Sequence, residues 1–165
     1  MPAIPDPDSL LRMREATAAD RPRLVAHINL AFSIENFIEG TRTDDEQLAA
    51  MMERGRILMA EDAADCLQAS VYIELRGQRG YLGMLAVDPA HQGRGLAHRT
   101  VEAAEERLRQ QGCEAVDILV LSQRSELLPI YRKFGYIETG TEEFKPSRAL
   151  KPGVECHAIV MSKKL

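Results

Sequence analysis

The sequence predicts a mixed α/β fold in which a mostly antiparallel central sheet of six to seven strands is flanked by about four helices. Two patterns along the chain predict it. Between residues 57 and 87, three apolar runs are separated by short polar segments, which is typical of an antiparallel meander. From residue 95 onward, helical and strand patterns alternate, and such alternation indicates parallel neighbours. The two halves together indicate one sheet of mixed direction.

The N-terminal part contains a short strand and two helices before the meander. Thr17 followed by Asp20, with Pro22 in the first turn, is typical of a capped helix start. Apolar residues then recur at helical spacing, for example at Leu24 and Ile28. The expected elements are a strand within 10–15, helices at 19–32 and near 44–54, and strands at 57–60, 67–75 and 81–87.

The C-terminal part is expected to contain two helices and three strands. Its longest helix has an apolar face and stops before Gly112, a residue type that often follows a helix C-terminus. Glu105 and Arg109 are expected to form an ion pair at i,i+4 spacing on this helix. The expected elements are a helix at 95–111, a strand at 115–121, a helix at about 125–134, and strands at about 136–143 and 154–162.

Length, composition and charge indicate an ordinary water-soluble domain. The 165 residues are 45% hydrophobic and 28% charged, and no apolar run approaches the roughly 20 residues of a membrane helix, so no membrane is expected as a partner. A single domain is expected over 10–165, with 1–9 as a flexible leader that lacks signal-peptide features. The net charge of -4, with both signs interspersed, argues against nucleic acid as a partner.

The cysteines and histidines show no pattern of a metal or covalent site. Cys66, Cys113 and Cys156 lack the spacing of a zinc site, which predicts no metal, reduced thiols and a cytoplasmic location. Cys156 precedes His157, but neighbours in a strand point to opposite faces, so both are interpreted as structural. The four histidines have no shared spacing and are interpreted as surface or core residues.

A strand, a glycine turn and a helix follow one another between Leu82 and Leu108. Pro89 ends the strand, Gly93 and Gly95 are separated by one residue, and an amphipathic helix follows directly. Such a turn points successive backbone N–H groups at one spot, adds the positive end of the helix dipole and leaves room for a phosphate. The segment is therefore predicted to bind the phosphates of a ligand.

Two common phosphate-binding motifs fit this turn poorly. A P-loop requires a lysine after its second glycine, and none follows Gly95. The dinucleotide fingerprint GxGxxG requires a glycine where His98 stands, and it normally follows the first strand of the domain.

The turn instead matches a different signature. Gln92-x-x-Gly95-x-Ala97 resembles the Q/R-x-x-G-x-G/A motif of the GNAT superfamily, the acyl-CoA-dependent N-acyltransferases. The segment 128–136, LPIYRKFGY, is similar to the YxxxGF ending of the same family, and the opening at 13–17 is also similar. The resemblance implies acetyl-CoA as co-substrate and a V-shaped splay between strands 4 and 5 of the sheet.

The resemblance also implies roles for individual residues. Backbone N–H groups of the turn would hold the pyrophosphate, namely those of Gln92, Gly93, Arg94, Gly95, Leu96 and Ala97. The Arg94 side chain would add positive charge. Backbone groups of Leu85 and Val87 would bind the pantetheine arm, and an amide near Leu85 or Ala86 would polarise the thioester carbonyl.

Tyr131 matches the family tyrosine whose hydroxyl lies near the coenzyme sulfur. A phenol of pKa about 10 stays protonated at neutral pH and can protonate a departing thiolate. The alternative interpretation is that Tyr131 only packs beside Phe134 and Tyr136. The asparagine that often stands seven positions earlier in the family is Arg124 here, so that coenzyme contact has no assigned residue.

The implied reaction is direct attack of a small-molecule or peptide amine on the acetyl group, without an acylated side chain. Glu35, Glu39 and Glu74 are the candidates for the general base. An acidic mouth that would suit a cationic amine is expected from Glu35, Glu39, Asp44, Asp45, Glu46, Glu142 and Glu143.

Other functions and assemblies stay open at this level. The main alternative is a non-catalytic acyl-CoA-binding module, in which the turn is kept but no transfer occurs. A nucleotide-binding switch is disfavoured by the missing P-loop lysine. The last two strands would suit a homodimer interface.

Overall fold

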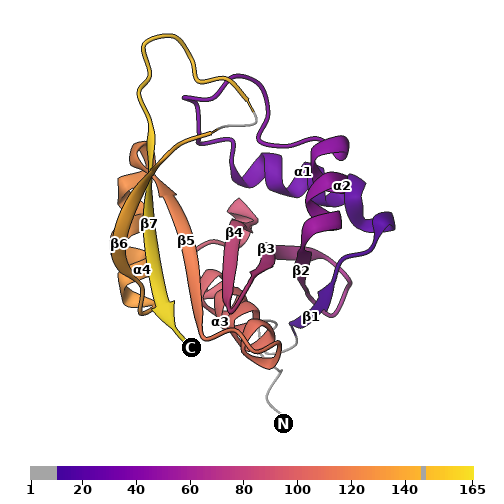
Figure 1. The fold of residues 1–165 in the computed structure, drawn as a ribbon. Helices are drawn as coiled ribbons and strands as arrows, with labels where there is room; N and C mark the ends of the chain where they lie inside the picture. The colour runs from indigo at the N-terminus through magenta and orange to yellow at the C-terminus, as the bar shows by residue number, and fades with distance from the viewer. Residues whose placement is uncertain (1–10, 146–147) are drawn as a thin grey trace.

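The computed structural model describes residues 11–145 and 148–165 and contains a seven-stranded sheet in the order β1-β2-β3-β4-β5-β7-β6 (Figure 1). The strands are β1 (Arg12–Glu15), β2 (Arg56–Glu61), β3 (Leu67–Arg76), β4 (Arg79–Val87), β5 (Ala115–Leu121), β6 (Ile137–Glu143) and β7 (His157–Lys164). The α-helices are α1 (Arg21–Ala31), α2 (Asp45–Arg54), α3 (Leu96–Gln110) and α4 (Leu128–Lys133), with short 3-10 turns at Ala18–Asp20, Pro89–His91 and Ser122–Leu127. The predicted mixed fold is confirmed, while the leader expected at 1–9 lies outside the described residues.

The sheet opens between β4 and β5. Neighbouring strands of the described sheet run antiparallel except these two, which pair in parallel only from Arg79 to Tyr81 of β4. Beyond Tyr81, β4 stays paired with β3, while β5 stays paired with β7 through Leu121 (Figure 1). The predicted splay between strands 4 and 5 is therefore confirmed. In the described part of the chain, no helix combines the length and apolar character needed to cross a membrane.

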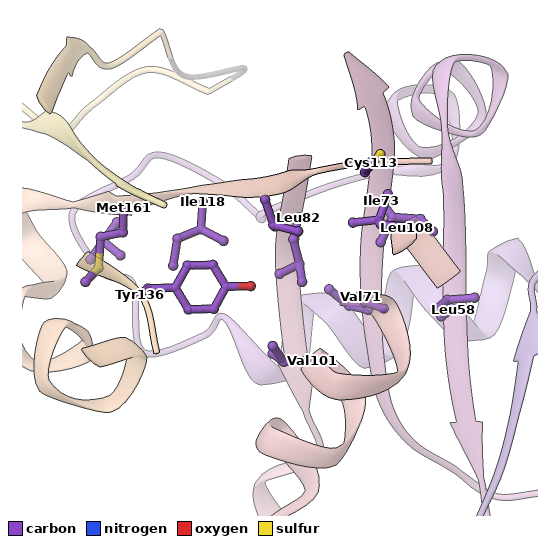
Figure 2. Close-up of a cluster of buried hydrophobic side chains, with 13 residues drawn as sticks. Leu58, Val71, Ile73, Leu82, Val101, Leu108, Cys113, Ile118, Tyr136 and Met161 are labelled. Carbon is purple, nitrogen blue, oxygen red and sulfur yellow. The ribbon is translucent and has the colours of Figure 1, made fainter. Parts of the chain in front are cut away.

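The hydrophobic core covers both faces of the sheet. On one face, α3 packs on the central strands through Val101, Ala104 and Leu108, the apolar face that helical spacing predicts. Figure 2 shows the ring of Tyr136 in the same cluster, extended toward Leu82 of β4. On the other face, α1 and α2 bury a second cluster with Leu24, Ile28, Leu48 and Met51. Burial on both faces explains why the central strands are almost continuously apolar.

The last helix, α4, and the last strand, β7, begin later than predicted. Instead of one helix over 125–134, a 3-10 turn precedes α4, and Arg124 in that turn has a non-helical backbone with φ -120° and ψ 41°. Pro129 lies in the first turn of α4, where its missing N–H removes no helical hydrogen bond, so the helix begins next to it. The last strand begins at His157 and not at 154.

The outer strand β6 forms one edge of the sheet, and all of its residues are exposed. An edge strand leaves one row of backbone groups without a partner strand in the described chain. The homodimer expected through the last two strands is compatible with this edge and stays a prediction.

The ion pair predicted on the longest helix is wrong. Glu105 is 3% exposed and pairs with Lys163 of β7 at 2.7 Å, while Arg109 pairs with Glu106. The cause is the helical period, since Glu105 stands four residues after Val101 and three before Leu108, on the buried face. A charge at that position requires a partner from the sheet.

A charged network fastens the N-terminal strand to the first helix. Arg14 of β1 donates two hydrogen bonds to Asp20, at 2.8 and 2.9 Å, and also bonds Glu61 of β2. Arg23 of α1 donates to the same two carboxylates. The hydrogen bonds from Arg14 hold the pKa of Asp20 well below its usual range. Burial alone raises the pKa of Glu61, but hydrogen bonds from both arginines outweigh it and lower the pKa.

We expect this network to make the fold sensitive to acid. Carboxyl groups with lowered pKa values contribute stability that is full above their ordinary values of 3.8 and 4.5 and is lost as the pH falls through the lowered values. Replacing Arg14 with Met should cost about 2–3 kcal/mol at pH 7, less than most broken buried pairs cost, because Arg14 is partly exposed. Urea unfolding of the variant should then depend less on pH between 5 and 3 than that of the wild type.

The matched control is Arg21→Met, since Arg21 pairs with the exposed Asp45. Its loss of stability should stay within about 0.5 kcal/mol, with the wild-type pH dependence. Equal losses in the two variants would contradict a special role for the Arg14 network.

Candidate functional site

The splay between β4 and β5 holds a pocket of about 530 Å³. The described walls come from six segments: β4, β5, the turn that leads into α3, the segment from Arg124 through α4, the end of α1 with the segment that follows it, and Phe144 just after β6. A second cavity of about 440 Å³ adjoins it and shares Phe32, Glu35 and Arg42 with the first. The strand divergence thus creates a hollow at the centre of the sheet.

The glycine turn forms one end of the larger pocket. Asp88 caps the 3-10 turn by accepting from the N–H of Ala90 at 2.9 Å, and Gly93 and Gly95 then take left-handed φ values of 80° and 75°. The carbonyl of Gly95 accepts the first bond of α3, from Arg99, so the N–H groups that open the helix have no intrahelical partner. A 15-residue helix adds its positive dipole end at the same place.

The structure places most of the predicted turn residues at the pocket. Its wall includes Gln92, Gly93, Gly95, Leu96 and Ala97. Arg94 lies outside the wall, is exposed, and contacts His91 at 3.2 Å, so the role of Arg94 stays a prediction. His91 and His98 also line the pocket, which sequence analysis missed although both flank the glycine turn.

A bulge in β4 turns the backbone beside the pocket. Two residues of β4 separate Gly83 from Ala86, while one residue of β3 separates their partners Tyr72 and Ser70. Met84 at the bulge has a left-handed φ of 49°, which is uncommon for a residue with a side chain. Sequence analysis missed the bulge, although a lone glycine inside a strand is a typical signal for one.

The three predicted β4 residues divide between the pocket and the core. Leu85 and Val87 line the pocket, whereas Ala86 is only 1% exposed. The carbonyl of Ala86 lies 3.3 Å from Nε2 of the buried His27, which is the donor when that nitrogen carries the proton. Burial lowers the pKa of His27, which favours the neutral ring. This contact ties α1 to the strand that borders the pocket.

Tyr131 packs against the core cluster and also lines the pocket. Its packing role is therefore seen in the structure, and its position also allows the predicted role at the coenzyme sulfur. Its ring lies edge-on to Phe134 at 5.9 Å and to Tyr136 at 6.0 Å between centroids. Burial raises the pKa of Tyr131 to about 12, and the positive charge of Arg124 acts in the opposite direction. The hydroxyl therefore keeps its proton at any physiological pH.

Of the three candidates for the general base, only Glu35 lines the larger pocket. Its Oε2 accepts a hydrogen bond of 2.7 Å from Arg124, and its side chain is 5% exposed. Glu39 borders the second cavity. Glu74 accepts from the Tyr72 hydroxyl at 2.6 Å and from Arg76 at 3.1 Å, outside both cavities.

Only two residues of the expected acidic mouth, Glu35 and Glu39, belong to the described walls of the two cavities. Asp44 instead caps α2 through the N–H of Gln47 at 2.8 Å and bonds Arg148. Asp45 pairs with Arg21. These carboxylates already have a nearby cation or helix end, and Glu35 is the one member of the expected set in the described wall of the larger pocket.

The cysteines lie away from this site. All three are unpaired in the structure, and none belongs to the described walls of the two cavities. Burial raises the pKa of Cys113, which disfavours a thiolate there.

Comparison with known families identifies the class of protein. The family model described as an acetyltransferase (GNAT) domain matches residues 27–147. The chain therefore belongs to the GNAT acetyltransferase family, as the glycine-turn motif and the segment 128–136 predicted.

Curated relatives match the chain over part of their own length. It is 34% identical over 59 residues to N-alpha-acetyltransferase 30 of Saccharomyces cerevisiae, an alignment that covers 36% of this chain and 34% of that protein. It is 25% identical over 150 residues to mycothiol acetyltransferase of Propionibacterium freudenreichii, covering 84% and 48%. The chain thus spans about a third to a half of the length of these relatives.

Solved structures share the fold at low identity. Spermidine N-acetyltransferase from Vibrio cholerae, in complex with CoA and spermine, superposes with a TM-score of 0.75 at 16% identity and covers 94% of this chain and 96% of its own. A candidate acetyltransferase from Salmonella typhimurium, solved with its cofactor acetyl-CoA, gives a TM-score of 0.72 at 20% identity and covers 94% of both chains. These likenesses concern the fold alone.

We expect Glu35 to stabilise the walls of the pocket. Glu35→Gln leaves Arg124 and Arg42 without their shared anion and should cost roughly 1–2 kcal/mol in urea unfolding at pH 7. Glu39→Gln, an exposed change on the same segment, is the matched control and should stay within about 0.5 kcal/mol. A variant pair with indistinguishable stabilities would show that the Arg124 contact is not stabilising.

Proposed function

We propose that this chain is an N-acetyltransferase that moves the acetyl group of acetyl-CoA directly to a primary amine of a small molecule or peptide. The observation that carries the proposal is a single pocket bordered by the glycine turn, the β4 bulge and Tyr131. Membership of the GNAT family and a related fold solved with acetyl-CoA support the same assignment.

In this proposal the coenzyme lies along the splay. Its pyrophosphate accepts hydrogen bonds from the N–H groups of the turn at 92–97, where the α3 dipole favours negative charge. Its pantetheine arm lies beside Leu85 and Val87, on the edge of β4 that β5 leaves after Tyr81. An extended arm with amide groups can replace part of the missing strand pairing.

The acetyl thioester then lies near the bulge, where a backbone amide close to Leu85 or Ala86 polarises its carbonyl. The neutral amine nitrogen forms a bond to the carbonyl carbon, and the bond from that carbon to sulfur breaks. The amine loses its proton to water or to a carboxylate of the pocket. The products are an acetamide and the thiol of coenzyme A, with no acylated side chain.

Tyr131 acts at the sulfur in this scheme. Because its pKa is raised to about 12, its hydroxyl stays protonated and donates a hydrogen bond to the developing thiolate. A phenol this weakly acidic stabilises the leaving group more than it gives up its proton, so water completes the protonation of a thiol whose own pKa is near 8.5.

The turn can be tested with the two glycines that flank α3. Gly95 and Gly112 stand at opposite ends of the helix, have φ values of 75° and 87°, and leave open space for a methyl group. Replacing either with Ala should cost a similar stability, about 1 kcal/mol, because the left-handed conformation is strained. Only Gly95→Ala should also weaken coenzyme A binding, by tenfold or more in titration calorimetry. Equal affinities in the two variants would argue against the turn as the coenzyme site.

Tyr131 can be tested against its neighbour Tyr136. Tyr131→Phe should lower kcat on the order of a hundredfold with little change in coenzyme A affinity, because only the hydroxyl at the sulfur is lost. Tyr136→Phe is the control, since its buried hydroxyl has no hydrogen-bond partner among the described residues. Thiol release with a panel of amines measures both, and similar rates in the two variants would remove Tyr131 from the mechanism.

The same assay separates the enzyme from a non-catalytic binding module. Coenzyme A binding together with thiol release that requires an amine supports the transferase. Binding without release from any amine of the panel favours the module.

A further inference from the structure

The two cavities meet at Phe32 and a small group of charged residues. Phe32, Glu35 and Arg42 line both, and Arg124 lines the larger one. The larger cavity contains the proposed thioester position, while the second is lined largely by polar residues such as Asn29, Asn36 and Thr41. When the amine of an acceptor reaches the thioester, the remainder of the acceptor molecule would therefore lie near these residues.

Two atoms of the group have unused hydrogen-bonding capacity. Oε1 of Glu35 and Nε of Arg42 are both buried, and neither has a hydrogen-bond partner among the described residues. They lie 3.8 Å apart, too far for a hydrogen bond to each other. Buried polar atoms without partners are costly, so a ligand that supplies both partners would bind favourably here.

Arg42 is held in place without being saturated. Its guanidinium carbon lies 5.1 Å from the centroid of the Phe32 ring, a cation–π contact that fixes the side chain. Within the described residues, its one ion pair is the long contact with Glu35. Its N–H groups are therefore free to bind a planar anion with two parallel hydrogen bonds.

The charges around the two cavities favour an acceptor that has an anionic group. Among the described lining residues the cations are Arg42, Arg124 and Lys151, and the anions are Glu35 and Glu39. Arg124 already donates a hydrogen bond to Glu35. Arg42 has no such short bond to a carboxylate, so its charge is less neutralised than that of Arg124. A polyamine would add positive charge to a site that already has an excess of it.

We propose that the acceptor is a free α-amino acid, whose carboxylate binds Arg42 and whose ammonium group donates to Oε1 of Glu35 before it loses a proton and attacks the thioester. This inference rests on the proposed transferase function and names its substrate class. An α-amino acid carries both groups on one carbon, so it can bridge two atoms that are 3.8 Å apart. Its side chain would extend into the second cavity.

A free amino acid fits better than the N-terminus of a peptide. In a peptide the carboxylate is replaced by a neutral amide carbonyl, which accepts a weaker hydrogen bond from a guanidinium. The difference between the acid and its amide therefore tests the proposal directly.

The experiment compares three forms of each amine: the L-amino acid, its carboxamide and the amine without the carboxyl group. The proposal expects kcat/KM for the best amino acid to exceed that for both relatives at least tenfold. Arg42→Gln should reduce this preference to near one, and Arg42→Lys should retain part of it. Lys151→Gln is the control and should leave the preference unchanged.

Several outcomes would overturn the proposal. Equal or higher kcat/KM for the carboxamides or simple amines with the wild type would do so, while the transferase function would stand. An unchanged preference in Arg42→Gln would remove Arg42 as the determinant. If no amine gives thiol release, the transferase function fails. Calorimetry of the coenzyme A complex with amino acids then tests the amino-acid site alone. Affinity that is lost in Arg42→Gln supports that site, and no binding to the wild type overturns it.

Discussion

The divergence of β4 and β5 is the constraint on which the site depends. Each strand has two edges, and β5 uses one of them fully against β7 while it meets β4 over only three positions. Beyond Tyr81 the facing edges of β4 and β5 have no partner strand in the described sheet. Because backbone groups removed from water require partners, this opening is suited to an extended ligand that contains amides.

The bulge at Met84 and the glycine turn follow one another along the chain, both beyond the last β4 residue that pairs with β5. The bulge changes the direction of backbone groups next to the gap, and its uncommon φ angle is held by β3 on the other side. After β4 ends, the short turn capped by Asp88 directs the chain into α3. One continuous segment thereby supplies both the strand edge and the helix end of the pocket.

Polar contacts connect the two sides of the pocket. Arg124 reaches from the end of β5 to Glu35 in the segment after α1, 89 positions away in sequence. The N–H of Lys151, between β6 and β7, donates to the carbonyl of Phe37 in the same segment at 2.9 Å. Figure 1 shows the chain after β6 approaching the chain after α1 at the top of the view. Where the family often has an asparagine, the longer and charged Arg124 makes its contact with Glu35.

The sequence by itself determined the order of the strands and helices, the glycine turn, the position of Tyr131 in the pocket wall and the family, because these depend on local periodicity and on a short contiguous motif. Only the tertiary structure decided which charges meet. Glu105 pairs with Lys163 from a distant strand and not with Arg109 as predicted. Glu35, expected in an acidic mouth, lies between Arg42 and Arg124. The physical reason is that ion pairs act through space over a few ångströms, so their partners follow from the packing of segments that are far apart along the chain.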